Sequence, residues 1–137
     1  MKIYFDHEKL EAYQKALAFA AWSEPILERI PKSVAVYGQL DRARTSIVLN
    51  IPEGNGRFTP ADRCKFFDIA RGSTLECAGC LDLLRIKKLV SESELDEGKS
   101  LLKETVSLLI GLIRSNSPDR LHEEEVEYRV GDGGFGI

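Results

Sequence analysis

A predicted helix around Gln39–Arg57 carries a polar stripe directly beside an apolar one. At about 100° per residue, each set of side chains occupies a narrow sector of the helix surface. The apolar sector holds Val36, Leu40, Ala43, Ile47 and Ile51, and the polar sector holds Arg42, Ser46, Asn50, Glu53 and Arg57. The chain must therefore bury one face of this helix and keep a second, chemically specific face beside the core. Gly54 and Gly56 follow, which predicts a helix end that uses a positive φ.

Three other segments also have helical spacing of their apolar residues, which predicts four helices in all. The first covers about residues 7–30 and contains Pro25, which predicts a kink or break near residues 21–24 because proline removes a backbone donor. The second predicted helix is the one that carries the polar stripe, and it runs over about residues 34–53. No window alternates with period two over a convincing length, so no strand is expected.

The third and fourth predicted helices have clear start signals. Thr59 is an N-cap candidate followed by Pro60 at the first helical position, and this helix can run to about residue 89. Gly72 and Gly79 within it are expected to let a neighbouring backbone approach closely. Ser91 and Glu94 form a capping-box pattern for the last helix, which ends near residue 116.

Short connections between long amphipathic helices predict an all-α fold, namely an up-down-up-down antiparallel four-helix bundle over residues 1–115. A second apolar ridge on the last helix consists of Leu101, Leu108 and Leu112. This ridge either widens the core stripe or forms a subunit interface, since extra apolar surface must be covered. The glycine-rich, acidic residues 116–137 have too little apolar material to fold alone and are expected to be a flexible or partner-dependent tail.

The charge distribution limits the partners that the chain can bind. Residues 1–115 hold 17 Lys and Arg against 16 Asp and Glu, whereas residues 116–137 hold 2 against 6. A near-neutral body argues against strong nonspecific binding of nucleic acid, although a local basic cluster survives such averaging. No apolar run approaches the roughly 18 to 20 residues of a membrane span, and no signal peptide is visible, which predicts a cytoplasmic protein.

The polar stripe also resembles a known family signature. The matching pairs are Gln39-Leu40, Arg42-Ala43, Ser46-Ile47, Asn50-Ile51, Glu53-Gly54 and Gly56-Arg57. Their order resembles the signature of the 23S rRNA intervening-sequence proteins, a bacterial family of four-helix bundles. The resemblance covers roughly residues 5–115 and continues through Phe66, Phe67, Ala70, Gly72, Ser73, Glu76 and Leu83.

The resemblance implies a homo-oligomer, most often a pentamer, and a bacterial source. One related branch, the accessory proteins of diversity-generating retroelements, binds nucleic acid and a reverse transcriptase. Those relatives are distinctly basic, whereas this chain is not. Two departures from the family pattern are Asp41, where a second basic residue is usual, and Pro52, where alanine is usual.

Two interpretations of the polar stripe follow. In one, Arg42 or Arg57 pairs with a largely buried Glu76, while Ser46, Asn50 and Ser73 complete a hydrogen-bonded network that fixes helix register. In the other, the arginines bind phosphates or an acidic partner when several copies surround an axis. The donors in this second interpretation are Arg42, Arg44, Arg57, Arg63 and Lys65.

The cysteines and histidines give little sign of chemistry. Cys77 and Cys80 lie within a predicted helix rather than at its N-terminus, so they are expected, with Cys64, to be small core residues rather than a redox or metal site. His7 is next to a helix start and His122 is in the tail. No catalytic residue, metal or cofactor is predicted.

The favoured function is a noncatalytic oligomeric scaffold or adaptor. Its partner is a protein that the sequence does not identify or a weakly bound nucleic acid, and no membrane is involved. The alternative is a small hydrolase or nuclease that uses Glu53, Glu76 and Asn50. That alternative lacks a phosphate-binding loop, because Gly54-Asn55-Gly56 follows a helix instead of preceding one.

Overall fold

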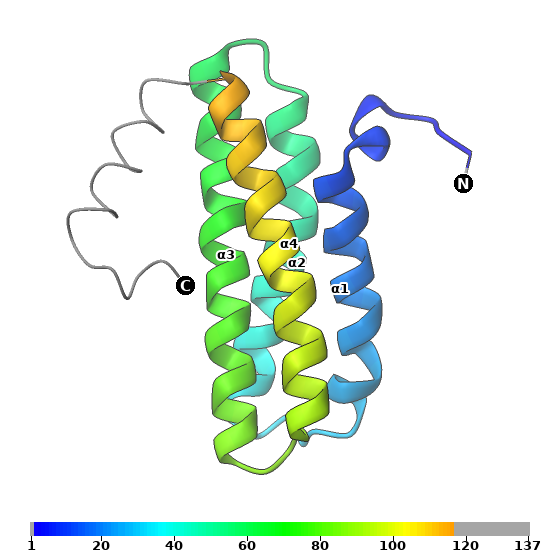
Figure 1. The fold of residues 1–137 in the computed structure, drawn as a ribbon, viewed down its shortest axis with the longest axis vertical. Helices are drawn as coiled ribbons and strands as arrows, with labels where there is room; N and C mark the ends of the chain where they lie inside the picture. Colours follow the sequence, from blue (N-terminus) through cyan, green and yellow to red (C-terminus); the bar gives the residue numbers. More distant parts are fainter. Residues whose placement is uncertain (1, 117–137) are drawn as a thin grey trace, which may run out of the picture.

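The computed structural model describes residues 2–116, and these residues form a short 3-10 turn and four α-helices (Figure 1). The turn, η1, spans Asp6–Lys9, and the helices are α1 (Glu11–Glu28), α2 (Ala35–Asn55), α3 (Pro60–Ile86) and α4 (Glu92–Asn116). No strand occurs within residues 2–116. The predicted all-α class is therefore confirmed. The predicted tail lies outside the described residues.

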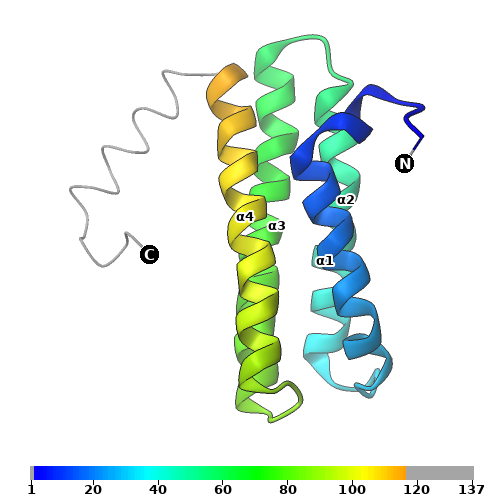
Figure 2. The same cartoon turned by 45° about the vertical axis from the view of Figure 1, so that its right-hand side comes forward.

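The four helices form an antiparallel bundle with the predicted up-down-up-down order (Figures 1 and 2). Each helix packs against two neighbours, in the cyclic order α1, α2, α3, α4. Within residues 2–116, the backbones of the diagonal pairs do not approach each other closely. The contacts of α3 with α2 and with α4 are more extensive than those that α1 makes with either of its neighbours. The connections between helices are short, which explains why sequence neighbours are also neighbours in space.

Both predicted helix starts are confirmed by their hydrogen bonds. Thr59 Oγ1 accepts a 3.2 Å hydrogen bond from the Asp62 backbone N–H at the start of α3. At the start of α4, the Ser91 backbone N–H donates to Glu94 Oε1 at 2.8 Å, and the Glu94 N–H donates to Ser91 Oγ at 3.0 Å. This reciprocal pair is a complete capping box.

The ends of the helices differ from the sequence expectations. The sequence predicted a kink or a break near residues 21–24, and of these two the break does not occur, because α1 continues through Pro25 to Glu28. Helix α3 stops at Ile86, and the chain then turns through Lys88, whose φ of 62° lies in the left-handed region. The Leu89 N–H closes this turn by donating to the Leu84 carbonyl at 2.9 Å. This geometry is a Schellman motif in which lysine occupies the position that usually holds glycine.

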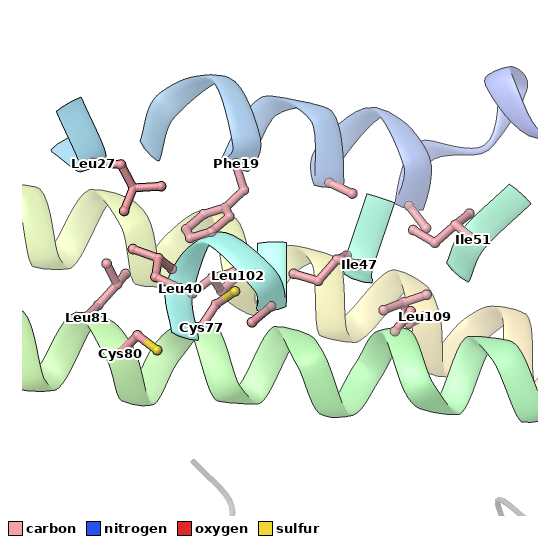
Figure 3. Packing of buried hydrophobic residues seen from close by; sticks show 14 of the residues in the cluster. Phe19, Leu27, Leu40, Ile47, Ile51, Cys77, Cys80, Leu81, Leu102 and Leu109 are labelled. Atoms are coloured by element: carbon pink, nitrogen blue, oxygen red, sulfur yellow. The ribbon is translucent and has the colours of Figure 1, made fainter. Parts of the chain in front are cut away.

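The core runs along the axis of the bundle and receives side chains from every helix (Figure 3). Phe19 of α1, Leu40 of α2, Leu81 of α3 and Leu102 of α4 are all at most 2% exposed. On α2 the predicted core face is confirmed, because Val36, Leu40, Ala43, Ile47 and Ile51 are all buried. Full burial of such a side chain contributes about 1.5–3 kcal/mol relative to leaving it in water.

Close packing depends on two glycines, Gly54 and Gly98, and neither was predicted for this role. A Cβ on Gly98 would lie 2.5 Å from Trp22 Cη2, and one on Gly54 would lie 2.8 Å from Phe67 Cε1. By contrast, a Cβ on either Gly72 or Gly79 would have nothing within 4 Å, so the expectation of a close approach at these two positions is wrong within this chain. The expectation of a positive φ after α2 is also wrong, because Gly56 has φ −84°.

The second apolar ridge of α4 belongs to the core. Leu101, Leu108 and Leu112 are half-buried and pack against the buried cluster, as the wide-stripe interpretation requires. The large exposed apolar side chains of the bundle lie mainly on α3 instead, and they are Ile69, Leu75, Leu83 and Ile86.

Candidate functional site

Part of the predicted polar network forms at the seam between α2 and α3. Ser46 Oγ and Ser73 Oγ are 2.8 Å apart, so one hydroxyl donates to the other across the two helices. Asn50 Nδ2 donates to the Ser46 carbonyl at 2.8 Å and to Ser46 Oγ at 3.0 Å. All three side chains are partly buried. This uncharged network fixes the register of α2 against α3.

The charged residues of the predicted network do not join it. Glu76 is exposed and, within residues 2–116, makes no ion pair, so the prediction of a buried pair with Arg42 or Arg57 is wrong. Glu76 immediately precedes the fully buried Cys77. One residue turns a helix by about 100°, which places Glu76 outside the core face.

The two arginines of the stripe have different surroundings. Arg57, in the connection that follows α2, pairs with Glu53 of α2 at 2.9 Å, and its guanidinium carbon lies 4.5 Å from the centre of the Phe66 ring. Arg42 is exposed and has no ion pair in the described part of the chain. Arg42 and Glu76 both act on the pKa of Cys80, in opposite directions, which places them around the same stretch of the seam.

Arg44 is the polar residue of α2 that sequence reasoning placed wrongly. Its side chain is 13% exposed, and its Nη2 lies 2.6 Å from Glu24 Oε1 and 3.0 Å from Asp41 Oδ1. Its Nη1 donates to the Ala20 carbonyl at 3.0 Å and to Ser23 Oγ at 3.1 Å. Arg44 therefore links α2 to α1 and is occupied within the fold. The sequence signal that identifies it is Asp41, three residues earlier on the same helix.

Electrostatics agree with this structural role of Arg44. Burial acts to lower the pKa of the Arg44 guanidinium, but the hydrogen bonds to Glu24 and Asp41 outweigh burial, and the pKa lies above its ordinary value. A guanidinium with these partners has few donors left for a phosphate.

The three cysteines are buried, which confirms their prediction as small core residues. Burial, with smaller contributions from Cys80 and Glu76, raises the pKa of the Cys77 thiol to about 12. Burial also raises the pKa of Cys80. The two thiols therefore stay protonated at neutral pH, whereas metal binding and disulfide exchange need the thiolate. Among the described residues, no three His, Cys, Asp or Glu side chains are grouped closely enough to hold a metal ion.

The hollow at the end of α2 does not bring the residues of the enzymatic alternative together. An open hollow of about 500 Å³ lies at the end of α2, and its lining includes Glu53 but neither Asn50 nor Glu76. Glu53 is engaged by Arg57, and the Asn50 amide by Ser46. The hollow is lined by Leu49, Pro52, Glu53, Gly56, Arg57 and Phe58.

Three of the four large exposed apolar residues of α3, all except Leu75, lie on a regular spacing that sequence reasoning missed. Positions 69, 72, 76, 79, 83 and 86 alternate steps of three and four, and they hold Ile69, Gly72, Glu76, Gly79, Leu83 and Ile86. We call these six residues the α3 stripe. All of them are exposed. A step of 3.5 residues is the period of helices that pack side by side in coiled coils.

One finding concerns membranes. None of the helices within residues 2–116 has the length and apolar character needed to cross a bilayer.

Comparison with known proteins places the chain in a family. Residues 8–111 match the family described as 23S rRNA-intervening sequence protein, and the chain belongs to this family. The predicted resemblance is thereby confirmed. Comparison with the curated proteins finds no match.

A solved structure shares the fold. It is a protein of unknown function from the S23 ribosomal protein family of Bacteroides thetaiotaomicron, and it superposes with a TM-score of 0.70 at 24% sequence identity. The match covers 75% of this chain and 98% of that one.

Proposed function

We propose that this member of the 23S rRNA-intervening sequence protein family is a noncatalytic, cytoplasmic scaffold or adaptor that works as a homo-oligomer. The observation that carries the proposal is the α3 stripe, an apolar surface with coiled-coil spacing that the bundle does not cover. Its apolar members are 43% (Ile69), 46% (Leu83) and 75% (Ile86) exposed. Apolar side chains that gather in this way on one helix mark an interaction site.

The partner on this surface is a second copy of the chain. Gly72 and Gly79 leave open space above the α3 backbone, so a helix of another copy can approach closely between the large apolar side chains. Glu76 lies in the middle of the stripe, and Arg42 borders the same seam. Because both are free of ion pairs within residues 2–116, each is available to pair with its counterpart on a neighbouring copy.

A cyclic pentamer is the assembly that we propose, and the number five comes from the family resemblance alone. Closed rings use one heterologous interface repeatedly, so each copy needs two complementary surfaces. The α3 stripe supplies one of them. Repetition around an axis also multiplies any weak contact with a protein or nucleic-acid partner, which suits an adaptor.

The lining of the hollow at the end of α2 supports the noncatalytic part of the proposal. Acid and base catalysis need two groups within reach of one substrate. Glu53 and Glu76 lie on different helices, and only Glu53 borders the hollow at the end of α2.

Light scattering coupled to gel filtration tests the assembly. The full chain at micromolar concentration should elute at a mass far above 15.3 kDa, near five times that value for a pentamer. Leu83→Glu places a charge in the α3 stripe and should reduce the mass to that of one chain. Leu49→Glu is the matched control, since Leu49 is 59% exposed on α2 outside the stripe, and it should leave the mass unchanged. A monomeric native chain would overturn the proposal.

A further inference from the structure

One end of the bundle combines an uncovered aromatic side chain with a group of cations. Phe58, in the connection from α2 to α3, is 97% exposed and borders the hollow of about 500 Å³. Leu49 and Pro52 also line this hollow. A phenylalanine side chain that is almost fully exposed is unusual, because covering it removes a large apolar area from water. We call Leu49, Pro52, Arg57, Phe58, Arg63 and Lys65 the end surface.

Positively charged side chains gather at the same end of the bundle, around the neighbouring aromatic residue Phe66. Arg57 and Lys65 both lie over the Phe66 ring, at 4.5 Å and 5.8 Å from its centre. Arg63 Nε donates to the Arg57 carbonyl at 2.7 Å, which holds the two arginines together. Among the ion pairs of residues 2–116, none involves Arg63 or Lys65. The end surface therefore carries two cations without a carboxylate partner in the described part of the chain.

The chain leaves the bundle at this same end. Figure 1 shows the last turn of α4 beside the connection between α2 and α3. Cys64 Sγ, near the start of α3, lies 3.7 Å from the carbonyl oxygen of Ile113, near the end of α4. The sequence continues for 21 residues, 117–137, after Asn116. An extended segment of that length reaches about 70 Å, so every atom of the end surface is within its range.

The composition of residues 117–137 complements the end surface. The segment contains six acidic residues and two arginines, and its acidic run is Glu123, Glu124, Glu125, Val126 and Glu127, followed by Tyr128. Carboxylates match the unpaired cations, and the apolar and aromatic side chains match the hollow beside Phe58. Tethering through α4 gives such a segment an effective concentration in the millimolar range, so weak contacts suffice.

We propose that the acidic C-terminal segment of each chain folds back onto the end surface of the same chain. Its glutamates lie against Arg57, Arg63 and Lys65, and its Tyr128 covers Phe58. The segment thereby shields the exposed cations of this end from other anions. An acidic partner or a nucleic acid that binds here must first displace the segment, which makes the segment an intramolecular competitor.

Zero-length cross-linking of the full chain tests this contact. A carbodiimide joins a carboxylate to an amine only when the two groups touch. Cleavage after Arg120 and Arg129 releases the acidic run as the single peptide 121–129, so its cross-links are easily identified by mass. We expect this peptide to link to Lys65 at least fivefold more than to Lys32, Lys87 or Lys88, which lie in the connections at the opposite end of the bundle.

Three controls make the result decisive. Arg57→Gln should lower the yield with Lys65 at least twofold, whereas Lys32→Gln, which removes an equal charge at the opposite end, should not change it. Sodium chloride at 0.5 M should lower the yield, because screening lengths fall to a few ångströms at such ionic strength. A mixture of isotope-labelled and unlabelled chains separates links within a chain from links between chains.

The outcomes divide clearly. Links to Lys65 that are within a chain, sensitive to salt and sensitive to Arg57→Gln support the proposal. Equal links to all lysines, links found only between chains, or a yield that Arg57→Gln leaves unchanged would each overturn it. The result does not depend on the α3 stripe, so the scaffold proposal and this one can fail separately.

Discussion

Arg42 and Arg44 stand two residues apart on α2 and face opposite sides of the helix. Arg44 is only 13% exposed, and it contacts the Glu24 carboxylate and two further oxygen atoms of α1 as well as the Asp41 carboxylate of α2. Arg42 is exposed and has no ion pair among residues 2–116. Arginine therefore stabilises the fold on one side of α2, whereas the arginine on the other side has no ion pair within residues 2–116.

The two seams of α2 differ in the same way. The seam between α2 and α1 is held by the charged Arg44 and its partners. The seam between α2 and α3 is held by the uncharged contacts of Ser46, Asn50 and Ser73. A partly buried charge must have partners, because losing its water without replacement is costly. The cations that have no ion pair within the described part of the fold are the ones available to bind other molecules. This contrast separates residues that stabilise the bundle from residues that recognise a partner.

The largest predicted effect comes from breaking the α1 seam. Arg44→Gln should lower the free energy of unfolding by about 1–3 kcal/mol, which is less than for a fully buried pair because Glu24 and Asp41 remain half-exposed and hydrated. Arg42→Gln should change it by less than about 0.5 kcal/mol, as for a surface substitution. Urea unfolding followed by circular dichroism measures both. Using the Leu83→Glu background removes any contribution from assembly.

Equal effects of the two substitutions would contradict the comparison. If Arg42→Gln destabilised the chain as much as Arg44→Gln, Arg42 would have a structural partner that the fold does not show within residues 2–116. The scaffold proposal adds a second readout, because Arg42→Gln should reduce the oligomeric mass of the native chain without affecting the stability of its Leu83→Glu variant.

A smaller effect is expected at the α3 seam. Ser46→Ala or Ser73→Ala removes one hydroxyl of the 2.8 Å contact, which should cost about 0.5–1.5 kcal/mol each. The double substitution should cost clearly less than the sum, because either single change already breaks the contact. Additive costs in the same urea experiment would show that the two hydroxyls act independently. Thr45→Ala is a control at an exposed hydroxyl on the same helix.

Local sequence signals predicted the parts of the fold that depend on near neighbours. Thr59 with Pro60 marked the start of α3, and Ser91 with Glu94 marked the start of α4, since each cap forms within four residues. Helical spacing likewise identified the core face of α2, whose five predicted apolar residues are all buried. These features depend on backbone geometry that any α-helix shares.

Features that depend on the rotation of one helix against another were harder to predict. Glu76 was expected to be largely buried and paired with Arg42 or Arg57, but the core face of α3 centres on Thr74 and Cys77, both 0% exposed. A small rotation thus decides whether a carboxylate is buried or free. Gly98 illustrates the same limit, since its need for space arises from Trp22, which lies 76 positions earlier in the chain.

The smallest predicted effect concerns a third charged contact, between Arg29 at the end of α1 and Glu94 of α4. Unlike Arg44, Arg29 is exposed. Arg29 Nη2 lies 2.6 Å from Glu94 Oε1, and this hydrogen bond, aided by the Ser91 N–H, lowers the pKa of Glu94 to about 2 from 4.5. A carboxyl with a lowered folded-state pKa stabilises the fold above pH 4.5, and this stabilisation is lost progressively as the pH falls toward 2. Because water screens the pair, Arg29→Gln should cost below about 1 kcal/mol at pH 7. Urea unfolding of the native chain and the variant should give free energies that differ at pH 7 and converge near pH 2. A difference that stayed constant across this range would show that Arg29 acts through its hydrogen bond to the Leu89 carbonyl and not through Glu94.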